Sequence, residues 1–177
     1  MRPLRSGDPL ANPEGLIERV YAYAAYRLGD GPDAEDVTSE VFERAVRYRK
    51  SYDRSKGEPV TWLLGIARRC IGTALAAPSH DPLEPAEIAD SRSIEEDSVR
   101  KLTLAGAIAQ LSERDRDLIA LRFGADLTAV QIAQVIDAQT NAIEVALHRA
   151  LGRLRSILDA EEQTALPRTS EANARSL

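Results

Sequence analysis

The stretch AAPSHDPLEPAEIADSRSIEED, at residues 76–97, constrains the fold most, because it interrupts a chain that otherwise has a helical pattern. It holds three prolines and seven acidic side chains, with little periodic apolar content. Such a composition is typical of an extended segment and not of a packed core. We therefore assign residues 76–98 to an acidic, proline-rich linker.

On both sides of this linker, apolar side chains recur at spacings of three and four residues, and the alternation typical of β-strands is absent. This pattern predicts an all-α protein with two small helical domains, at residues 15–75 and 99–158. The chain ends, residues 1–14 and 159–177, lack the pattern and are expected to be disordered.

Composition narrows the function further. The chain has 177 residues, of which 44% are hydrophobic, and no run approaches the roughly 18 apolar residues of a membrane span. Its first residues lack the apolar segment of a signal peptide, so we expect a soluble, cytoplasmic protein without membrane insertion. The single cysteine, Cys70, lies in an apolar run and is expected to pack in the core. The net charge of −5 argues against a general nucleic-acid binder, but much of the acidity belongs to the linker.

The predicted helix DAEDVTSEVFERAVRYRK, at residues 33–50, has two stripes. One is apolar and is expected to be buried; the other is acidic and is interpreted either as a solvated face or as a docking surface for a basic partner. The apolar stripe consists of Ala34, Val37, Val41, Ala45 and Tyr48, and the acidic stripe of Asp33, Asp36, Glu40 and Glu43.

The next stretch, RYRKSYDRSKGEP at residues 47–59, mixes cations with aromatic rings. Cations neutralise phosphate and rings stack on unpaired bases, so this mixture favours single-stranded nucleic acid. A helix is predicted to follow from Pro59, with Trp62 at the edge of its polar face. Its apolar side is predicted to hold Leu63, Ile66, Ala67, Cys70, Ile71 and Ala74, and its other side Thr61, Gly65, Arg68, Arg69, Gly72 and Thr73.

The stretch from Leu127 to Leu158 predicts two helices separated by a short polar turn, the pattern of a helix-turn-helix. Ser112 with Asp115, and Thr128 with Gln131, have the spacing of helix caps. The packed face is predicted to hold Ile132, Ala133, Ile136, Ile143, Leu147, Ala150, Leu151 and Leu154. The opposite face would present Asn141, Ala142, Val145, His148, Arg149 and Gly152.

Taken in order, four stretches resemble the extracytoplasmic-function sigma factors of bacterial RNA polymerase. They are DAEDVTSEVFERAV, WLLGIARRC, LSERDRDLIALRF and IAQVIDAQTNAIEVALHRALGRLR. The resemblance covers residues 15–158 and implies a sigma domain 2-like bundle, which docks on the polymerase clamp and opens the −10 element. It also implies a sigma domain 4-like helix-turn-helix that reads the −35 element.

The resemblance places three sets of site residues on this chain. The polymerase-binding set is Asp33, Asp36, Glu40 and Glu43. The −10 set is Tyr48, Tyr52, Arg54, Lys56, Trp62, Arg68 and Arg69, and the −35 set is Thr140, Asn141, Val145, His148, Arg149 and Arg153.

The chain departs from the family at both promoter-reading surfaces, which have lost charge. Arg69 and Thr73 stand where the family often has Asn and Asp, and Glu144 and Ala146 stand where it has basic residues. Base readout remains available to Asn141 on adenine, Val145 on a thymine methyl group and Glu144 on cytosine N4. Arg149, Arg153 and Arg155 are left for the phosphate backbone.

These features favour a sigma factor whose partners are core RNA polymerase, promoter DNA and an anti-sigma factor. No catalytic constellation, cofactor motif or metal-ligand cluster is evident in the sequence, so no enzymatic activity is expected. Two alternatives stay open: a sigma-like decoy that binds polymerase or an anti-sigma factor without reading promoters, and a helix-turn-helix regulator that binds duplex DNA without polymerase.

Overall fold

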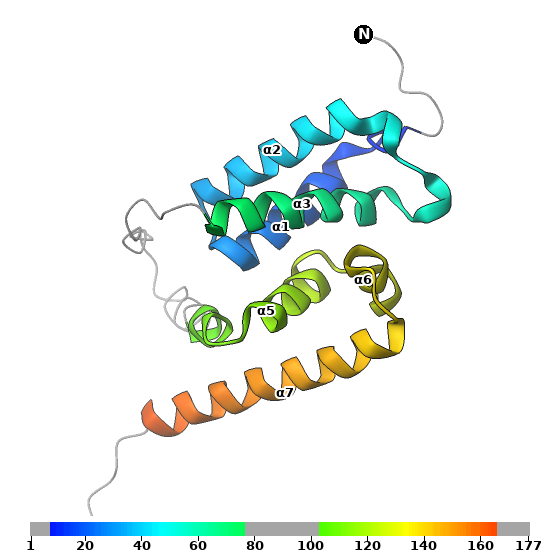
Figure 1. Cartoon of the computed structure of the whole chain (residues 1–177). Helices are drawn as coiled ribbons and strands as arrows, with labels where there is room; N and C mark the ends of the chain where they lie inside the picture. Colours follow the sequence, from blue (N-terminus) through cyan, green and yellow to red (C-terminus); the bar gives the residue numbers. More distant parts are fainter. Residues whose placement is uncertain (1–7, 77–102, 166–177) are drawn as a thin grey trace, which may run out of the picture.

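The computed structural model describes residues 8–76 and 103–165, and the described residues contain helices and no strands (Figure 1). The all-α expectation is therefore confirmed for this part of the chain. The predicted linker lies almost entirely outside the described residues.

The first half of the molecule is a bundle of α1 (Pro13–Leu28), α2 (Pro32–Tyr48) and α3 (Pro59–Ala76). Each helix has proline in its first turn, where the missing N–H is not needed by the helix. Two short 3-10 turns, η1 (Arg49–Ser51) and η2 (Arg54–Lys56), join α2 to α3. The bundle core holds fully buried side chains such as Tyr23, Leu63 and Leu64.

The second half contains α5 (Glu113–Ile119), the π-helical turn η3 (Ala120–Gly124), α6 (Ala129–Ile136) and α7 (Thr140–Ala165); residues 103–109 are also helical. Both predicted caps are present. The Ser112 hydroxyl accepts from the Asp115 N–H at 3.2 Å, and Thr128 and Gln131 form a reciprocal capping box. These caps fix where α5 and α6 begin.

The predicted buried stripes are largely confirmed, with exceptions where a helix face meets no neighbour. Tyr48, Ala74 and Leu151 were expected in the core, but all three are exposed, Tyr48 to 54% and Leu151 to 40%. Thr61 was placed on the polar side and is instead buried. The expectation of a disordered tail from residue 159 was wrong up to Ala165, because α7 continues to that residue.

The two halves pack against each other. The sequence predicted two helical domains joined by a linker and gave no sign of this contact. Helix α1 lies against η3 and α5, and α3 lies against α6 (Figure 1). One cluster of buried side chains runs through both halves and includes Val20 and Tyr23 from α1 with Leu118 and Leu121 from the second half. Among the described residues, no helix is long and apolar enough to span a membrane.

Candidate polymerase and nucleic-acid interfaces

Helices α6 and α7 form the predicted helix-turn-helix. Asp137 closes α6 in the left-handed conformation, with φ of 59° and ψ of 57°, and its N–H donates to the Ala133 carbonyl. This conformation costs little for Asp, whose short polar side chain tolerates it. The turn ends when α7 begins at Thr140, so the first turns of α7 occupy the position of a recognition helix.

The exposed face of α7 carries the residues predicted for it. Asn141, Val145, His148 and Arg149 are exposed, and Thr140 at the first turn is half-buried. The opposite face is buried through Ile143, Leu147, Ala150 and Leu154. This arrangement leaves an uninterrupted face of the size that enters a major groove, with its first cation at Arg149.

Arg153, which is predicted for the −35 set, forms an ion pair within the protein. Its Nε and Nη2 donate to the two carboxylate oxygens of Asp115 at 2.7 and 2.8 Å. The Arg153 guanidinium lowers the pKa of the buried Asp115 carboxyl below its ordinary value. This bidentate pair joins α7 to the start of α5, whereas Arg149 and Arg155 are exposed on α7.

Four of the predicted −10 residues surround one hollow of about 390 Å³ between the α2–α3 connection and α3. These residues are Tyr52, Lys56, Trp62 and Arg69. The Tyr52 and Trp62 rings lie 5.5 Å apart at 57°, and the Tyr52 hydroxyl donates to the Gly57 carbonyl at 3.0 Å. Two rigid rings beside Lys56 and Arg69 form the kind of site that can stack an unpaired base and neutralise its phosphate.

The hollow also has a wall that the sequence did not predict. Gln134 and Val135 of α6 line it together with the first-half residues. The Gln131 amide at the start of α6 donates to the Glu58 carboxylate at 2.8 Å, which holds this wall in place. Part of the candidate −10 site is therefore covered by the second half.

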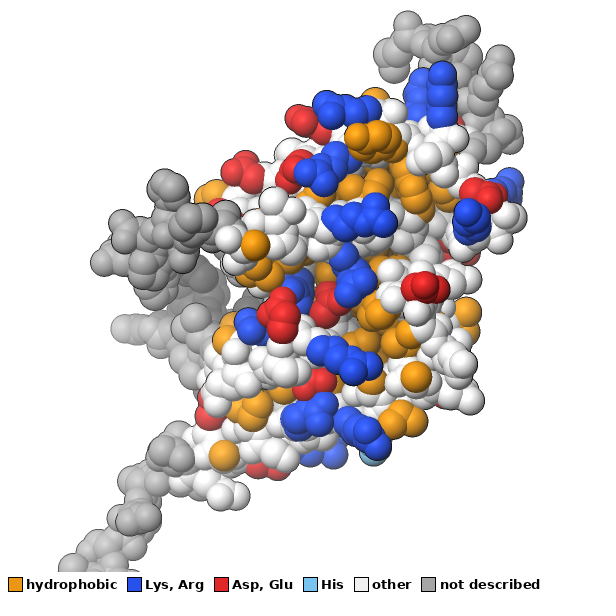
Figure 2. Space-filling view, viewed as in Figure 1, with side chains coloured by type: hydrophobic (Ala, Val, Ile, Leu, Met, Phe, Trp, Pro, Cys, Tyr) orange, Lys and Arg blue, Asp and Glu red, His pale blue; other side chains and the backbone are white. Residues whose placement is uncertain are grey.

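The remaining −10 residues lie outside this hollow. Tyr48, at the end of α2, and Arg54, in η2, are exposed. Arg68 points toward the second half, where its Nε donates to an Asp117 oxygen at 2.9 Å. Lys and Arg side chains nevertheless gather in a band that crosses both halves on the face seen in Figure 2.

The acidic stripe lies on the outer face of α2. Asp33, Asp36 and Glu43 are exposed, and the half-buried Glu40 pairs with Arg44 one turn later at 2.5 Å. The second half packs on α1 and α3, so the stripe remains accessible. It offers a basic partner three adjacent carboxylates without an ion pair among the described residues.

Within residues 8–76 and 103–165, neither the thiol nor the carboxylates offer a metal site. Cys70 is buried in α3, and burial raises the pKa of its thiol. Among the described residues, no group of three or more His, Cys, Asp or Glu side chains could hold a metal ion.

Comparisons with known proteins match both halves of the chain. The model of Sigma-70 region 2 matches residues 14–77, and that of Sigma-70 region 4 matches residues 107–156. The ECF RNA polymerase sigma factor SigD of Mycobacterium bovis is 32% identical, over 77% of this chain and 70% of its own length. The ECF RNA polymerase sigma factor BldN of Streptomyces coelicolor is 31% identical over 80% of this chain, and the match spans 56% of that longer relative.

Two solved structures share the fold. CnrH, in complex with the cytosolic domain of CnrY, has a TM-score of 0.59 at 19% identity, over 88% of each chain. The sigma factor RpoE of Bartonella quintana, in complex with the anti-sigma factor NepR, has a TM-score of 0.62 at 16% identity, over 82% of this chain and 93% of that chain.

The two family matches fall on the two helical halves described above, with the predicted linker between them. The relatives are sigma factors, in agreement with the expectation of a protein without enzymatic activity. The chain belongs to the ECF sigma factors of RNA polymerase.

Proposed function

We propose that this chain binds core RNA polymerase and directs it to promoters whose −10 and −35 elements it reads. The observation that carries this proposal is the presence on one chain of two surfaces whose chemistry suits two different nucleic-acid contacts. One is the ring-lined hollow of Tyr52, Lys56, Trp62 and Arg69, which suits an unpaired strand. The other is the exposed face of α7, which suits a duplex groove.

Together with the acidic stripe of α2, these surfaces give the chain three contacts, each with its own function. The carboxylates of α2 dock on a basic surface of the polymerase, the hollow captures a base from the opened −10 strand, and α7 reads the −35 element. On α7, Asn141 suits adenine and Val145 suits a thymine methyl group, and Arg149 contacts phosphate. Because α7 has few cations, contacts between polymerase and the first half supply much of the affinity.

A domain organisation follows from this division. Residues 15–75 act as the polymerase-binding and −10 domain and residues 99–158 as the −35 domain, joined by the linker at 76–98. We further propose a cytoplasmic location, where the polymerase acts, and control by an anti-sigma factor. RpoE of Bartonella quintana, which shares the fold, forms such a complex. The decoy alternative is not favoured, because both sigma regions are matched.

Transcription by purified core polymerase tests this proposal. The full chain would be added to core polymerase with a pool of genomic fragments, and the transcript starts would be sequenced. We expect starts at a small set of fragments that share two upstream elements, absent when the chain is omitted. A chain that binds core polymerase yet yields no specific start would instead be a decoy.

A further inference from the structure

A cavity of about 670 Å³ lies where the end of α1 meets the first helical residues of the second half. Its walls are mostly apolar, with Leu28 from α1 and Leu104 and Ile108 from residues 103–109. Alanine side chains complete much of these walls, and their small size leaves the space open. A mostly apolar cavity of a few hundred cubic ångströms with few polar groups is the usual form of a small-molecule site. None of the residues proposed for polymerase or promoter contacts lines it.

Two arginines supply the main polar groups of this cavity. The Arg27 side chain is only 6% exposed, and the Arg116 side chain is 31% exposed. The Nε atom of each is buried and has no hydrogen-bond partner among the described residues. A buried N–H without an acceptor is costly, and both arginines line the cavity. An oxygen atom of a ligand in the cavity would supply the acceptor that these donors lack.

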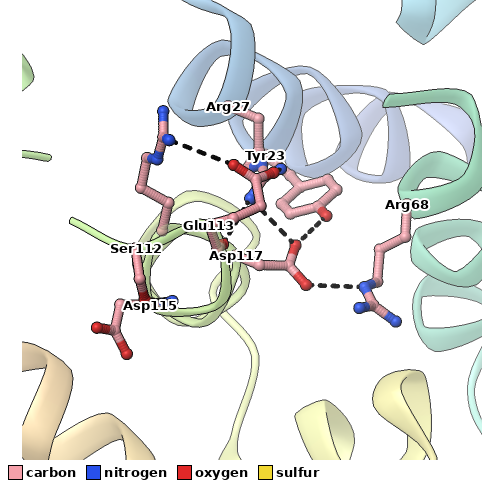
Figure 3. Close-up of polar contacts among 8 residues, drawn as sticks. Tyr23, Arg27, Arg68, Ser112, Glu113, Asp115 and Asp117 are labelled. Carbon is pink, nitrogen blue, oxygen red and sulfur yellow. Dashed lines mark hydrogen bonds and ion pairs between the residues drawn. The ribbon is translucent and has the colours of Figure 1, made fainter. Parts of the chain in front are cut away.

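The remaining nitrogens of the two arginines show that one carboxylate can bridge both guanidinium groups. Arg27 Nη2 donates to one Glu113 oxygen (Figure 3), and Arg116 Nη2 lies 3.3 Å from the other. The Glu113 side chain is 60% exposed, so it attracts these cations only weakly. Because a guanidinium group carries donors along more than one edge, the Nε atoms remain for a second carboxylate.

The ion pairs around the two arginines carry an excess of positive charge. Arg27 Nη1 lies 3.8 Å from one oxygen of Asp117, and the other oxygen accepts from Arg68 at 2.9 Å. Together with Arg116, three guanidinium groups therefore face two carboxylates, those of Asp117 and Glu113. The acid among the lining residues, Asp30, is exposed, so solvent screens its charge. The cavity therefore favours an anion over a cation.

We propose that this cavity binds a small amphipathic acid, with its carboxylate at the two Nε atoms and its apolar body against the leucine and isoleucine side chains. The guanidinium groups select an acid, because a charge-assisted hydrogen bond is stronger than a neutral one. The apolar walls select a hydrocarbon or aromatic body over a sugar, whose hydroxyl groups would lose their hydrogen bonds to water there. The site goes beyond the proposed function and does not depend on it.

Isothermal titration calorimetry of the full chain with decanoate tests the site. Decanol has the same apolar chain without the charge, and decyltrimethylammonium carries the opposite charge. We expect decanoate to bind saturably with a single molecule per chain. Decanol should bind about tenfold more weakly, since it lacks the charge-assisted hydrogen bonds. Decyltrimethylammonium should not bind.

Two substitutions test where the ligand lies. Arg116→Gln removes one of the two cations and should weaken decanoate binding about tenfold while leaving decanol binding unchanged. Arg114→Gln is the matched control, because Arg114 is exposed on the same helix and outside the cavity. Ala105→Trp fills the cavity and should abolish binding of both compounds, whereas Ser156→Trp, at an exposed position of α7, should not. Circular dichroism and thermal unfolding would verify that each variant folds.

The absence of saturable decanoate binding would overturn the proposal, and so would binding of many molecules per chain, as expected of a detergent. Equal affinity for decanoate and decanol, or an Arg116→Gln variant equal to wild type, would refute the acid as the ligand. Decanoate binding that survives Ala105→Trp would place the ligand outside this cavity and refute the site. Transcription enters none of these measurements, so a failure of this site and a failure of the proposed function are distinguishable.

Discussion

Arg153 and Arg149 show how neighbouring cations on one helix take different tasks. Both are exposed on α7, but Arg153 has a buried carboxylate within reach and Arg149 has none among the described residues. Arg153 therefore helps to hold α7 on α5, while Arg149 is exposed and is predicted to contact DNA. The same division separates Arg68, held by Asp117, from the exposed Arg69 next to it.

The Asp115 and Arg153 pair predicts a stability that depends on pH. Because the pair lowers the pKa of Asp115 in the folded state, its contribution is present above the unfolded value, near 3.8, and is lost as pH falls through the lower folded value. Asp115→Asn should therefore lower the free energy of unfolding by about 1–2 kcal/mol at neutral pH, since the exposed Arg153 limits the effect. Urea unfolding would be measured from about pH 2.5 to about pH 7. The difference in free energy of unfolding between Asp115→Asn and wild type should shrink only in acid. A gap that is constant with pH would contradict the pair's role.

Base readout by α7 predicts different effects for neighbouring residues. Asn141→Ala should relax the preference at a single base pair of the −35 element, at a cost of about 1–3 kcal/mol. Arg149→Ala should weaken binding to all sequences alike and reduce its salt dependence. Holoenzyme binding to a panel of single-base variants, at several salt concentrations, separates the two effects. If Asn141→Ala leaves the preference intact, α7 does not read this element through Asn141.

At the scale of elements, the periodic patterns predicted the helices well, because each helix buries one face and the spacing of its apolar residues reports that face. The failures occur where a helix passes beyond its neighbours. Tyr48 ends α2 and Leu151 lies on an outer side of α7, so both have the right spacing and nothing to pack against. The spacing of apolar residues indicates which face of the helix a side chain is on. Only the tertiary structure shows whether another element packs against that face.

The candidate sites were predicted less completely, for a related reason. The set Tyr52, Lys56, Trp62 and Arg69 could be proposed because the residues are close in sequence. The wall of Gln134 and Val135, and the hydrogen bond from Arg68 to Asp117, join segments far apart in the chain and have no local signal. The ion pair of Arg153 with Asp115 was missed in the same way, since the two residues lie 38 positions apart.

Helix α2 as a docking element predicts a loss of polymerase binding on charge reversal. Asp36→Lys combined with Glu43→Lys should abolish co-purification with core polymerase, because both side chains are exposed on one face and would repel a basic partner. Glu14→Lys combined with Glu18→Lys, on the exposed side of α1, is the matched control and should bind normally. Equal binding by the two double variants would mean that the acidic stripe of α2 is a solvated face and not a docking surface.

The ring-lined hollow predicts a defect in strand opening and not in assembly. Tyr52→Ala and Trp62→Ala should still bind core polymerase, but each should weaken capture of the opened strand by about 1–3 kcal/mol. Permanganate reactivity of −10 thymines in the holoenzyme complex measures this step. Phe123→Ala removes an exposed ring outside the hollow, so −10 thymines in its complex should react as they do with wild type. Unchanged reactivity in the hollow variants would remove these rings from the −10 site.

At the scale of the whole molecule, the chain combines weak surfaces that act together. The net charge is −5 and the recognition face of α7 is poor in cations, so neither half is suited to hold DNA tightly alone. Linking the two halves to one polymerase makes the second contact effectively intramolecular, which raises the joint affinity without new contacts.

The central claim, that this chain reads two promoter elements on behalf of polymerase, is tested most directly by transcription from altered templates. Core polymerase and the full chain would transcribe a promoter found in the genomic pool, alongside copies with the −10 element scrambled, the −35 element scrambled, or the spacing between them lengthened by half a helical turn. We predict run-off product from the intact template and a strong loss from each altered one. Equal product from the intact and the −35 scrambled templates would contradict promoter reading by α7 and the account built on it.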